Sequence, residues 1–221
     1  MRVSQILPVI QGENPTAGLP MLLIRLAGCP LRCSFCDTRY ALDLNSGTEM
    51  SIKQIHSKIK KYSPEWILLS GGEPLMQEKE LGELLMTIPI RADIEIQTSG
   101  FYSPPTWHFS ALWTVDYKCP SSDAESKNIE KWLDVLSRQD NIKFVVGTEE
   151  DLEFVRTRRL YTEAQILVSP VIWDIKDYLG QVVIGKEQAE WMRRVAEFCM
   201  GTGYRLSLQT HRIIWGERND V

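Results

Sequence analysis

Short apolar runs recur along the chain, and segments in which apolar residues follow helical spacing lie between them. The runs predict seven strands, over residues 22–26, 66–69, 94–97, 112–115, 142–146, 165–168 and 204–208. Most runs are continuously apolar instead of alternating, which is typical of strands covered on both faces in a parallel sheet. The pattern therefore predicts a sheet built from β/α units.

Helical spacing fills most of the intervals between these runs. It predicts helices over residues 52–59, 81–85, 129–136, 152–155 and 189–199. A serine-x-x-glutamine capping box, from Ser51 to Gln54, marks the start of the first helix. Residues 101–110 contain two consecutive prolines and no helical spacing, so this connection is predicted to be a loop.

These elements predict one domain over residues 1–221, with an extra segment at its N-terminus. Seven strands are too few for an eightfold barrel, so we expect an α/β fold that forms an open or partial barrel. In such folds the chemistry gathers at the carboxyl ends of the strands. Candidate functional residues are therefore sought directly after each predicted strand.

The charge balance argues against a nucleic-acid or membrane partner. Lys plus Arg number 25 and Asp plus Glu number 29, a net charge of −4, and like charges form no long runs. No apolar stretch approaches the roughly 20 residues of a membrane span, and the N-terminus lacks the pattern of a secretory leader. We therefore expect a cytoplasmic protein.

Three of the five cysteines form a C-x3-C-x2-C loop directly after the first predicted strand. Such a cluster, made here by Cys29, Cys33 and Cys36, indicates metal or redox chemistry. A closed structural zinc site usually has four ligands. Three thiolates on an iron–sulfur cluster instead leave one iron free for the amino and carboxylate groups of S-adenosylmethionine (SAM). We favour the cluster over zinc or a redox thiol, and the spacing resembles that of the radical SAM superfamily.

Glycines and polar residues follow four other predicted strands. They are Gly72 after 66–69, Thr98 and Gly100 after 94–97, Lys118 and Ser121 after 112–115, and Ser169 after 165–168. Consecutive glycines let a ligand approach the backbone, and lysine is a flexible donor to an anion or a ribose oxygen. Because the carboxyl ends of parallel strands meet at one edge of a sheet, these residues point to one shared cavity.

Further segments resemble a narrower family, the 7-carboxy-7-deazaguanine synthases. They are Gln11-Gly12-Glu13, Ala17-Gly18, residues 25–29, Cys36-Asp37-Thr38 and residues 208–216, so the resemblance runs nearly from end to end. It implies a modified partial TIM-type (β/α) barrel of the radical SAM superfamily and a homodimer. It also implies a lyase that converts 6-carboxy-5,6,7,8-tetrahydropterin to 7-carboxy-7-deazaguanine with release of ammonia, in queuosine and 7-deazapurine biosynthesis.

The resemblance also implies roles for individual residues. Cys29, Cys33 and Cys36 are expected to hold a 4Fe–4S cluster, and Thr38 is expected to bind Mg²⁺. SAM is expected to contact Phe35, Cys36, Asp37, Gly72, Gly100, Lys118, Ser121 and Ser169. The pterin is expected to contact Ile10, Gln11, Gly12, Glu13, Arg25, Thr98, His211 and the terminal Val221. A reductant of the flavodoxin or ferredoxin type is expected to supply electrons.

Some residues are predicted from their own surroundings. Arg25 stands in an apolar strand, so it is expected either to clamp the substrate or to form a salt bridge inside the barrel. His211 is expected on the last strand, beside Gln209. Cys199 is predicted to be a core residue, and Cys119 is not expected to be a fourth cluster ligand.

Two other interpretations remain open at this point. A glycyl-radical activase of the same superfamily has the same cysteine loop but acts on a protein, and a non-enzymatic zinc-binding module needs no SAM. Gln11-Gly12-Glu13 and the segment around His211 favour the synthase over the activase. Asn14, Gln97 and Ser99 depart from the residues that the family usually carries at these positions.

Overall fold

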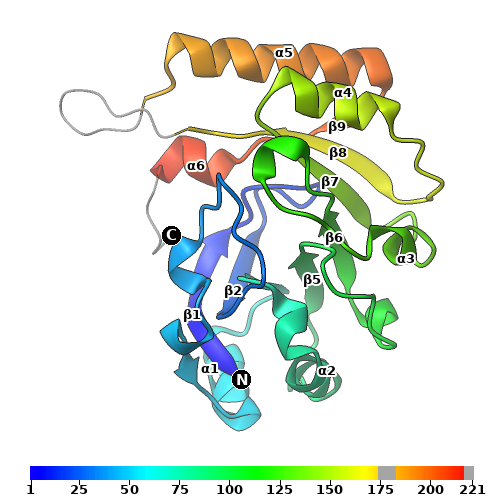
Figure 1. The fold of residues 1–221 in the computed structure, drawn as a ribbon. Helices are drawn as coiled ribbons and strands as arrows, with labels where there is room; N and C mark the ends of the chain where they lie inside the picture. The colour runs from blue at the N-terminus through cyan, green and yellow to red at the C-terminus, as the bar shows by residue number, and fades with distance from the viewer. Residues whose placement is uncertain (174–182, 217–221) are drawn as a thin grey trace.

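Nine strands form one curled sheet in the computed structural model, which describes residues 1–173 and 183–216 (Figure 1). The strand order is β3-β1-β2-β4-β5-β6-β7-β8-β9, and neighbours are parallel from β2 onward. The parallel strands are β2 (Pro20–Leu26), β4 (Trp66–Gly71), β5 (Asp93–Thr98), β6 (Leu112–Asp116), β7 (Asn141–Val146), β8 (Gln165–Pro170) and β9 (Arg205–Leu206). The predicted partial barrel is confirmed, with a strand in each predicted segment.

Two strands that the apolar pattern did not predict extend the sheet at its N-terminal edge. β1 (Arg2–Ile10) pairs antiparallel with β2 and with the short β3 (Thr48–Glu49). β3 pairs only with Arg2 and Val3, so the rest of β1 forms an edge of the described sheet. Proline lacks an N–H and is tolerated on such an edge, which explains how Pro8 lies within a strand.

The helices lie between the strands as predicted; α3 ends earlier than predicted, and the others have longer bounds. They are α1 (Ile52–Tyr62), α2 (Glu78–Met86), α3 (Ile129–Leu133), α4 (Glu149–Thr157) and α5 (Lys186–Thr202). The capping box of Ser51 and Gln54 is present at the start of α1. Between β5 and β6 the chain forms a loop with only a 3-10 turn, His108–Ser110, as the two prolines predicted. No helix in the described part of the chain is long and apolar enough to cross a membrane.

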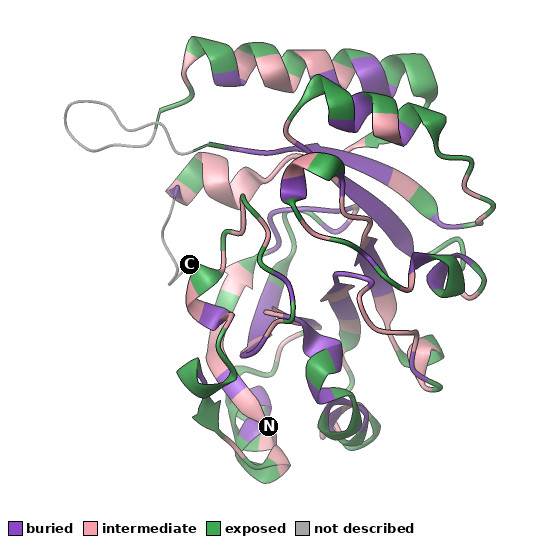
Figure 2. Cartoon of the chain, in the orientation of Figure 1, coloured by how far each residue is buried: buried purple, intermediate pink, exposed green. Residues whose placement is uncertain are grey.

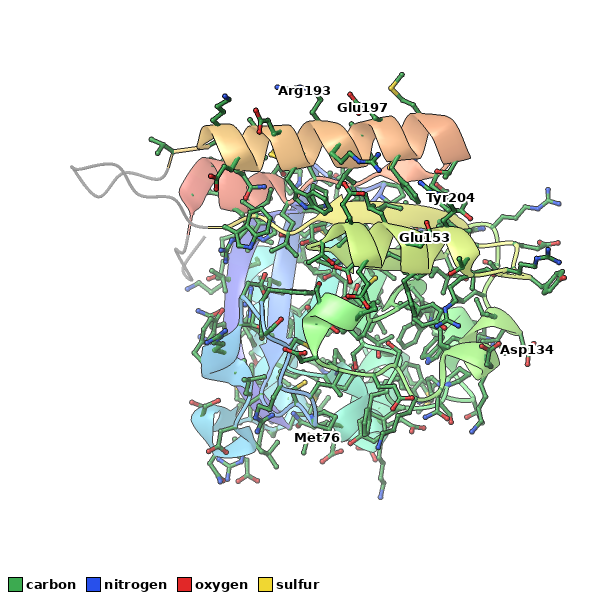
Figure 3. The ribbon with its side chains drawn as sticks, turned by 45° about the horizontal axis from the view of Figure 1, so that its top comes forward. Met76, Asp134, Glu153, Arg193, Glu197 and Tyr204 are labelled. Carbon is green, nitrogen blue, oxygen red and sulfur yellow. The ribbon has the colours of Figure 1, made fainter. Side chains whose placement is uncertain are left out.

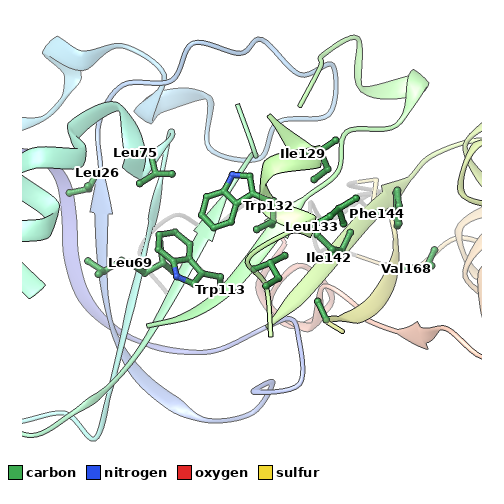
Figure 4. Close-up of a cluster of buried hydrophobic side chains, with 14 of the residues drawn as sticks. Leu26, Leu69, Leu75, Trp113, Ile129, Trp132, Leu133, Ile142, Phe144 and Val168 are labelled. Atoms are coloured by element: carbon green, nitrogen blue, oxygen red, sulfur yellow. The ribbon is translucent and has the colours of Figure 1, made fainter. Parts of the chain in front are cut away.

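Successive residues of the strands face opposite sides of the sheet, and both sides are covered (Figure 2). Ile24, Leu69 and Val115 belong to the apolar core between the sheet and the helices. This core also holds Trp113 and Trp132, whose tilted rings have centroids 4.8 Å apart (Figure 4). The residues that alternate with them line a cavity inside the partial barrel. This double coverage explains the continuously apolar strands.

The longest helix, α5, covers the sheet with one face only. Val195, Phe198 and Cys199 are buried, whereas Arg193 and Glu197 project away from the sheet (Figure 3). The prediction that Cys199 is a core residue is therefore confirmed.

The C-terminal part of the described chain differs from the prediction. Only Arg205 and Leu206 pair with β8, and Gln209 precedes a short helix, α6 (Thr210–Trp215), which lies beside the ends of β1 and β2 (Figure 1). The prediction that His211 lies on the last strand is wrong. The chain leaves the sheet because the N–H and hydroxyl of Thr210 donate to the Gly12 carbonyl, at 2.8 and 3.0 Å. This contact is between distant segments, so local sequence did not reveal it.

Candidate active site

A cavity of about 960 Å³ opens at the carboxyl ends of the parallel strands. The cysteine loop, the segment after β1 and helix α6 complete its wall. The predicted site residues that line it are Ile10, Gln11, Gly12, Glu13, Arg25, Cys29, Cys33, Phe35, Cys36, Asp37, Thr38, Gly72, Thr98, Lys118 and His211. Most of the predicted cofactor and substrate residues thus share one cavity.

Four predicted site residues are not placed in this wall. Gly100 is buried behind Thr98, and its N–H donates to the Thr98 hydroxyl at 3.4 Å. Ser121 donates its N–H to Asp151 at 2.9 Å. Ser169 is buried, and its hydroxyl has no partner among the described residues. Val221 lies outside the described residues.

The three cysteines of the loop line one side of the cavity as free, half-buried thiols. The loop is folded locally, since the Cys36 N–H donates to the Cys33 carbonyl at 3.2 Å. Cys119 does not join them, because it is buried in the core and its thiol faces the Tyr117 carbonyl at 3.9 Å. The cavity therefore offers three thiol ligands and no fourth cysteine, which fits a cluster with one open iron.

Two glycines at the end of β4 hold the strand against the backbone that leads into the cysteine loop. Gly71 has φ +138°, and a Cβ there would lie 2.2 Å from the Leu26 carbonyl oxygen. A Cβ on Gly72 would lie 2.2 Å from the Gly28 carbonyl oxygen. The sequence suggested that these glycines admit a ligand. They also let two backbone segments meet, which fixes the cysteine loop relative to β4.

Glu73 connects this glycine turn to the next strand end. Its buried carboxylate accepts hydrogen bonds from the Thr98 hydroxyl at 2.8 Å and from the Ser99 N–H at 2.7 Å. It also accepts from the Leu75 N–H at 3.0 Å. Glu73 therefore fixes the position of Thr98 at the cavity.

A buried charge network forms another part of the cavity wall. The Lys143 ammonium, on β7, contacts the Glu13 carboxylate and lies 3.2 Å from Asp116 Oδ1. Asp116 Oδ2 pairs with Lys118 at 3.0 Å, and Gln209 donates to Glu13 Oε1 at 2.9 Å. Burial alone would lower the pKa of Lys143, but Asp116 and Glu13 raise it above its usual range. Both carboxylates are therefore paired with a cation inside the cavity.

Arg25 reaches the cavity from β2. Its guanidinium donates to the Tyr40 hydroxyl and lies 5.5 Å from the centre of that ring, and Tyr40 donates to Gln5 at 3.1 Å. The Arg25 Nε has no hydrogen-bond partner among the described residues. The alternative of a salt bridge inside the barrel is not found within these residues, so the guanidinium can still pair with an anion in the cavity.

Helix α6 approaches the cysteine loop where His211 faces Asp37. His211 Nε2 lies 3.9 Å from Asp37 Oδ2. Enclosure by the protein would raise the pKa of Asp37, but His211, Arg25 and Arg212 lower it to about 2. The His211 ring also packs against Gly12, where a Cβ would lie 2.1 Å from Nδ1. The helix thus joins the substrate-side segment to the cysteine loop.

Comparison with known proteins agrees with this arrangement. The model of the radical SAM superfamily matches residues 23–107. A 7-carboxy-7-deazaguanine synthase of Koribacter versatilis is 34% identical, with 97% of this chain and 97% of that protein covered. The synthase of Leptospira interrogans is 33% identical, with 99% of this chain and 97% of that protein covered. This chain belongs to the 7-carboxy-7-deazaguanine synthase family.

The fold of this member of the synthase family also resembles that of a solved structure. The crystal structure of QueE from Escherichia coli has a TM-score of 0.68 and 22% identity, and the match covers 95% of this chain and 94% of that chain. Membership of the radical SAM superfamily implies a 4Fe–4S cluster and SAM as cofactors. The three thiols along one wall of the cavity fit that cluster.

Several cavity residues of this synthase-family chain were not predicted. Lys143 is a charged residue within an apolar strand. The same pattern had singled out Arg25, so it could have identified Lys143 as well. Gln209 was noticed only as a neighbour of His211. Tyr40 lies in the 3-10 turn Arg39–Ala41, and no local pattern marked it as a site residue. Only its contact with Arg25 places it at the cavity.

The buried thiols of the cysteine loop should make assembly of the cluster depend on pH. Burial raises the pKa of Cys29 to about 11 and also raises that of Cys33, so both are protonated in the metal-free protein at neutral pH. Thiolate is the form that binds metal, so assembly must release these protons. We expect the rate of anaerobic reconstitution, followed by cluster absorbance, to rise from about pH 7 and to go on rising above pH 9, because the pKa of Cys29 is about 11. A rate independent of pH would contradict the protonated state.

Proposed function

We propose that this chain converts 6-carboxy-5,6,7,8-tetrahydropterin to 7-carboxy-7-deazaguanine with release of ammonia. The observation that carries the proposal is the single cavity, which brings the cysteine loop together with Gln11-Gly12-Glu13 and Arg25. Full-length similarity to 7-carboxy-7-deazaguanine synthases supports the same substrate. When bound, the cluster and SAM supply radical chemistry that side chains cannot perform.

The chain itself binds and orients the pterin. The Arg25 guanidinium offers a planar donor pair to a carboxylate, and its position on β2 is fixed by Tyr40. The Glu13 carboxylate is held by Lys143 and Gln209, so it presents a fixed acceptor to ring N–H groups. Thr98, held by Glu73, offers its hydroxyl at the end of β5. These groups come from β2, from β5 and from the segment after β1, which limits the substrate to one orientation.

We also propose that Mg²⁺ binds in the cavity at Thr38. The Thr38 hydroxyl lines the cavity, and its hydrogen bond to the Gly71 carbonyl is long, at 3.4 Å. It is therefore available as an oxygen ligand, the type that Mg²⁺ prefers, and the substrate carboxylate and water would complete the shell. A templating cation here would hold the carboxylate during ring contraction.

Replacing this hydroxyl should change the Mg²⁺ requirement. For Thr38→Ala we expect the Mg²⁺ concentration at half-maximal turnover to rise by about tenfold or more, because a ligand is lost. Turnover at saturating Mg²⁺ should fall much less. Thr38→Ser retains the hydroxyl and serves as the matched control. An unchanged Mg²⁺ dependence of the alanine variant would argue against this site.

The assay of the reaction itself is direct. Reduced, reconstituted protein is incubated with 6-carboxytetrahydropterin, SAM and Mg²⁺, and the product is identified by mass spectrometry. We expect 7-carboxy-7-deazaguanine. Protein that carries about four irons per chain and cleaves SAM but yields no such product would refute the proposed substrate. Protein that binds zinc and no iron would support the non-enzymatic module instead.

Assembly, electron donor and compartment are further parts of the proposal. The resemblance supports a homodimer and a flavodoxin- or ferredoxin-type reductant. All five cysteines are free, which suits the reducing cytoplasm. Light scattering on the reconstituted protein distinguishes a dimer from a monomer.

A further inference from the structure

A buried carboxylate lies on β5, outside the predicted site. Glu95 is 0% exposed. Its Oε1 accepts hydrogen bonds from the side-chain amides of Gln11 at 2.9 Å and Asn14 at 2.8 Å, and its Oε2 accepts from the Thr16 hydroxyl at 2.5 Å. Gln97 of the same strand donates at 3.2 Å. Three of the four donors therefore come from one segment, residues 11–16.

This segment carries the residues proposed to contact the substrate. The Gln11 side chain is held at both ends, since its Nε2 donates to Glu95 and its Oε1 accepts from the Glu13 N–H at 3.2 Å. The Glu13 side chain then reaches Lys143 and Gln209 in the cavity wall. Glu95 therefore holds Gln11, Gln11 holds the backbone of Glu13, and the Glu13 side chain lies in the cavity wall.

The backbone of the segment needs this anchor. Asn14 has φ 63°, a left-handed conformation that asparagine tolerates better than most residues. Its side chain donates to Glu95, and its N–H donates to the Ser207 hydroxyl at 3.0 Å. Without an acceptor at residue 95, three buried donors of one turn lose their shared partner.

We infer that Glu95 is a positioning residue that fixes residues 11–16 against β5 and so places Gln11, Gly12 and Glu13 at the substrate. This inference rests on the proposed function of the cavity. Glu95 itself does not line the cavity, so it acts through the segment and not by contact with substrate.

The test compares Glu95→Ala with two other variants. Glu95→Gln retains an acceptor oxygen for the amides, and its own amide can donate to Thr16, so it should rescue the loss. Asp140→Ala is the matched control, because Asp140 is a buried carboxylate that accepts from the Trp113 N–H and the Ser137 N–H, both at 2.8 Å, away from the cavity.

Two readouts separate positioning from general stability. We expect Glu95→Ala to raise the KM for the pterin by about tenfold or more, with iron content and SAM cleavage unchanged, whereas Glu95→Gln stays within about threefold. Hydrogen exchange of the backbone amides of residues 11–16 should accelerate in Glu95→Ala and not in Asp140→Ala. If Glu95→Ala had the same KM for the pterin as the wild type, and the same hydrogen exchange at residues 11–16, the inference would be overturned.

Further outcomes distinguish failure of the Glu95 anchor from failure of the proposed substrate. If Glu95→Ala does not fold, the variant with Asn14→Gly and Thr16→Val removes two donors, keeps a residue that tolerates the left-handed backbone and leaves Glu95 in place. The same exchange and KM changes are expected. Wild-type turnover of the pterin tests the proposed function by itself. Faster exchange in Glu95→Ala together with no wild-type turnover would refute the substrate and uphold the anchor.

Discussion

Replacing Cys33 by alanine will leave the anaerobically reconstituted protein with no 4Fe–4S cluster and no detectable turnover. Cys29, Cys33 and Cys36 are the three thiols in the cavity, and Cys119 faces the core, so no other cysteine can take the vacant position. Two thiolates hold such a cluster poorly. Iron content should fall from about four per chain to near zero, with loss of the brown colour.

The control variants are the two buried cysteines. Cys119→Ala and Cys199→Ala remove small core side chains and should retain iron and SAM cleavage. If Cys33→Ala retained a full cluster, or if Cys119→Ala lost it, the assignment of the three ligands would be refuted.

The second large effect concerns the buried charge network. Lys143→Met should lower the free energy of unfolding by about 3 kcal/mol, because removing one partner of a buried pair leaves carboxylates without compensation. This loss lies at the lower end of the range for breaking a buried ion pair. In the variant, Asp116 still pairs with Lys118, and Glu13 still accepts a hydrogen bond from Gln209. Urea unfolding measures this loss, and turnover should also fall because Glu13 loses its support.

A surface pair provides the comparison for this stability loss. Arg194 and Glu149 form an exposed ion pair at 2.8 Å. Such pairs contribute about 0–1 kcal/mol, so Arg194→Ala should change stability little. Similar losses for Arg194→Ala and Lys143→Met would contradict the importance of burial in this network.

The loss caused by Lys143→Met should also depend on pH. Burial would raise the pKa of Asp116, but Lys118 and Lys143 lower it below its usual range. A carboxyl with a lowered folded pKa stabilises the protein above its ordinary pKa of about 3.9 and ceases to do so as the pH falls through the folded value. The difference in unfolding free energy between wild type and Lys143→Met should therefore shrink as the pH falls below about 4.

The sequence predicted individual site residues best where the chemistry is local. The spacing of Cys29, Cys33 and Cys36 is a local pattern, and these thiols do lie together in the cavity. Ser121 and Ser169 were chosen because they follow strands, yet they do not line the cavity. Ser121 lies in the turn after β6, whereas Ser169 lies within β8, so following a predicted strand did not decide where either side chain points.

Two unusual residues show why some signals could not be interpreted from the sequence. Asn14 and Gln97 depart from the family's usual residues, and no neighbouring residue explains either departure. Both donate to Glu95, so the departures concern one buried carboxylate. Glu95 looked like an ordinary polar residue of a strand, because nothing local reveals which donors will surround it.

By itself, the sequence determined the parallel strands, most of the helices and the cysteine loop, because periodicity, capping and ligand spacing are properties of neighbouring residues. Only the tertiary structure decided that Lys143 pairs with Glu13, 130 residues away, and that α6 packs on Gly12. It also decided that Glu95 anchors residues 11–16. These contacts join distant segments, and their strength comes from burial, which exists only once the sheet has closed around them.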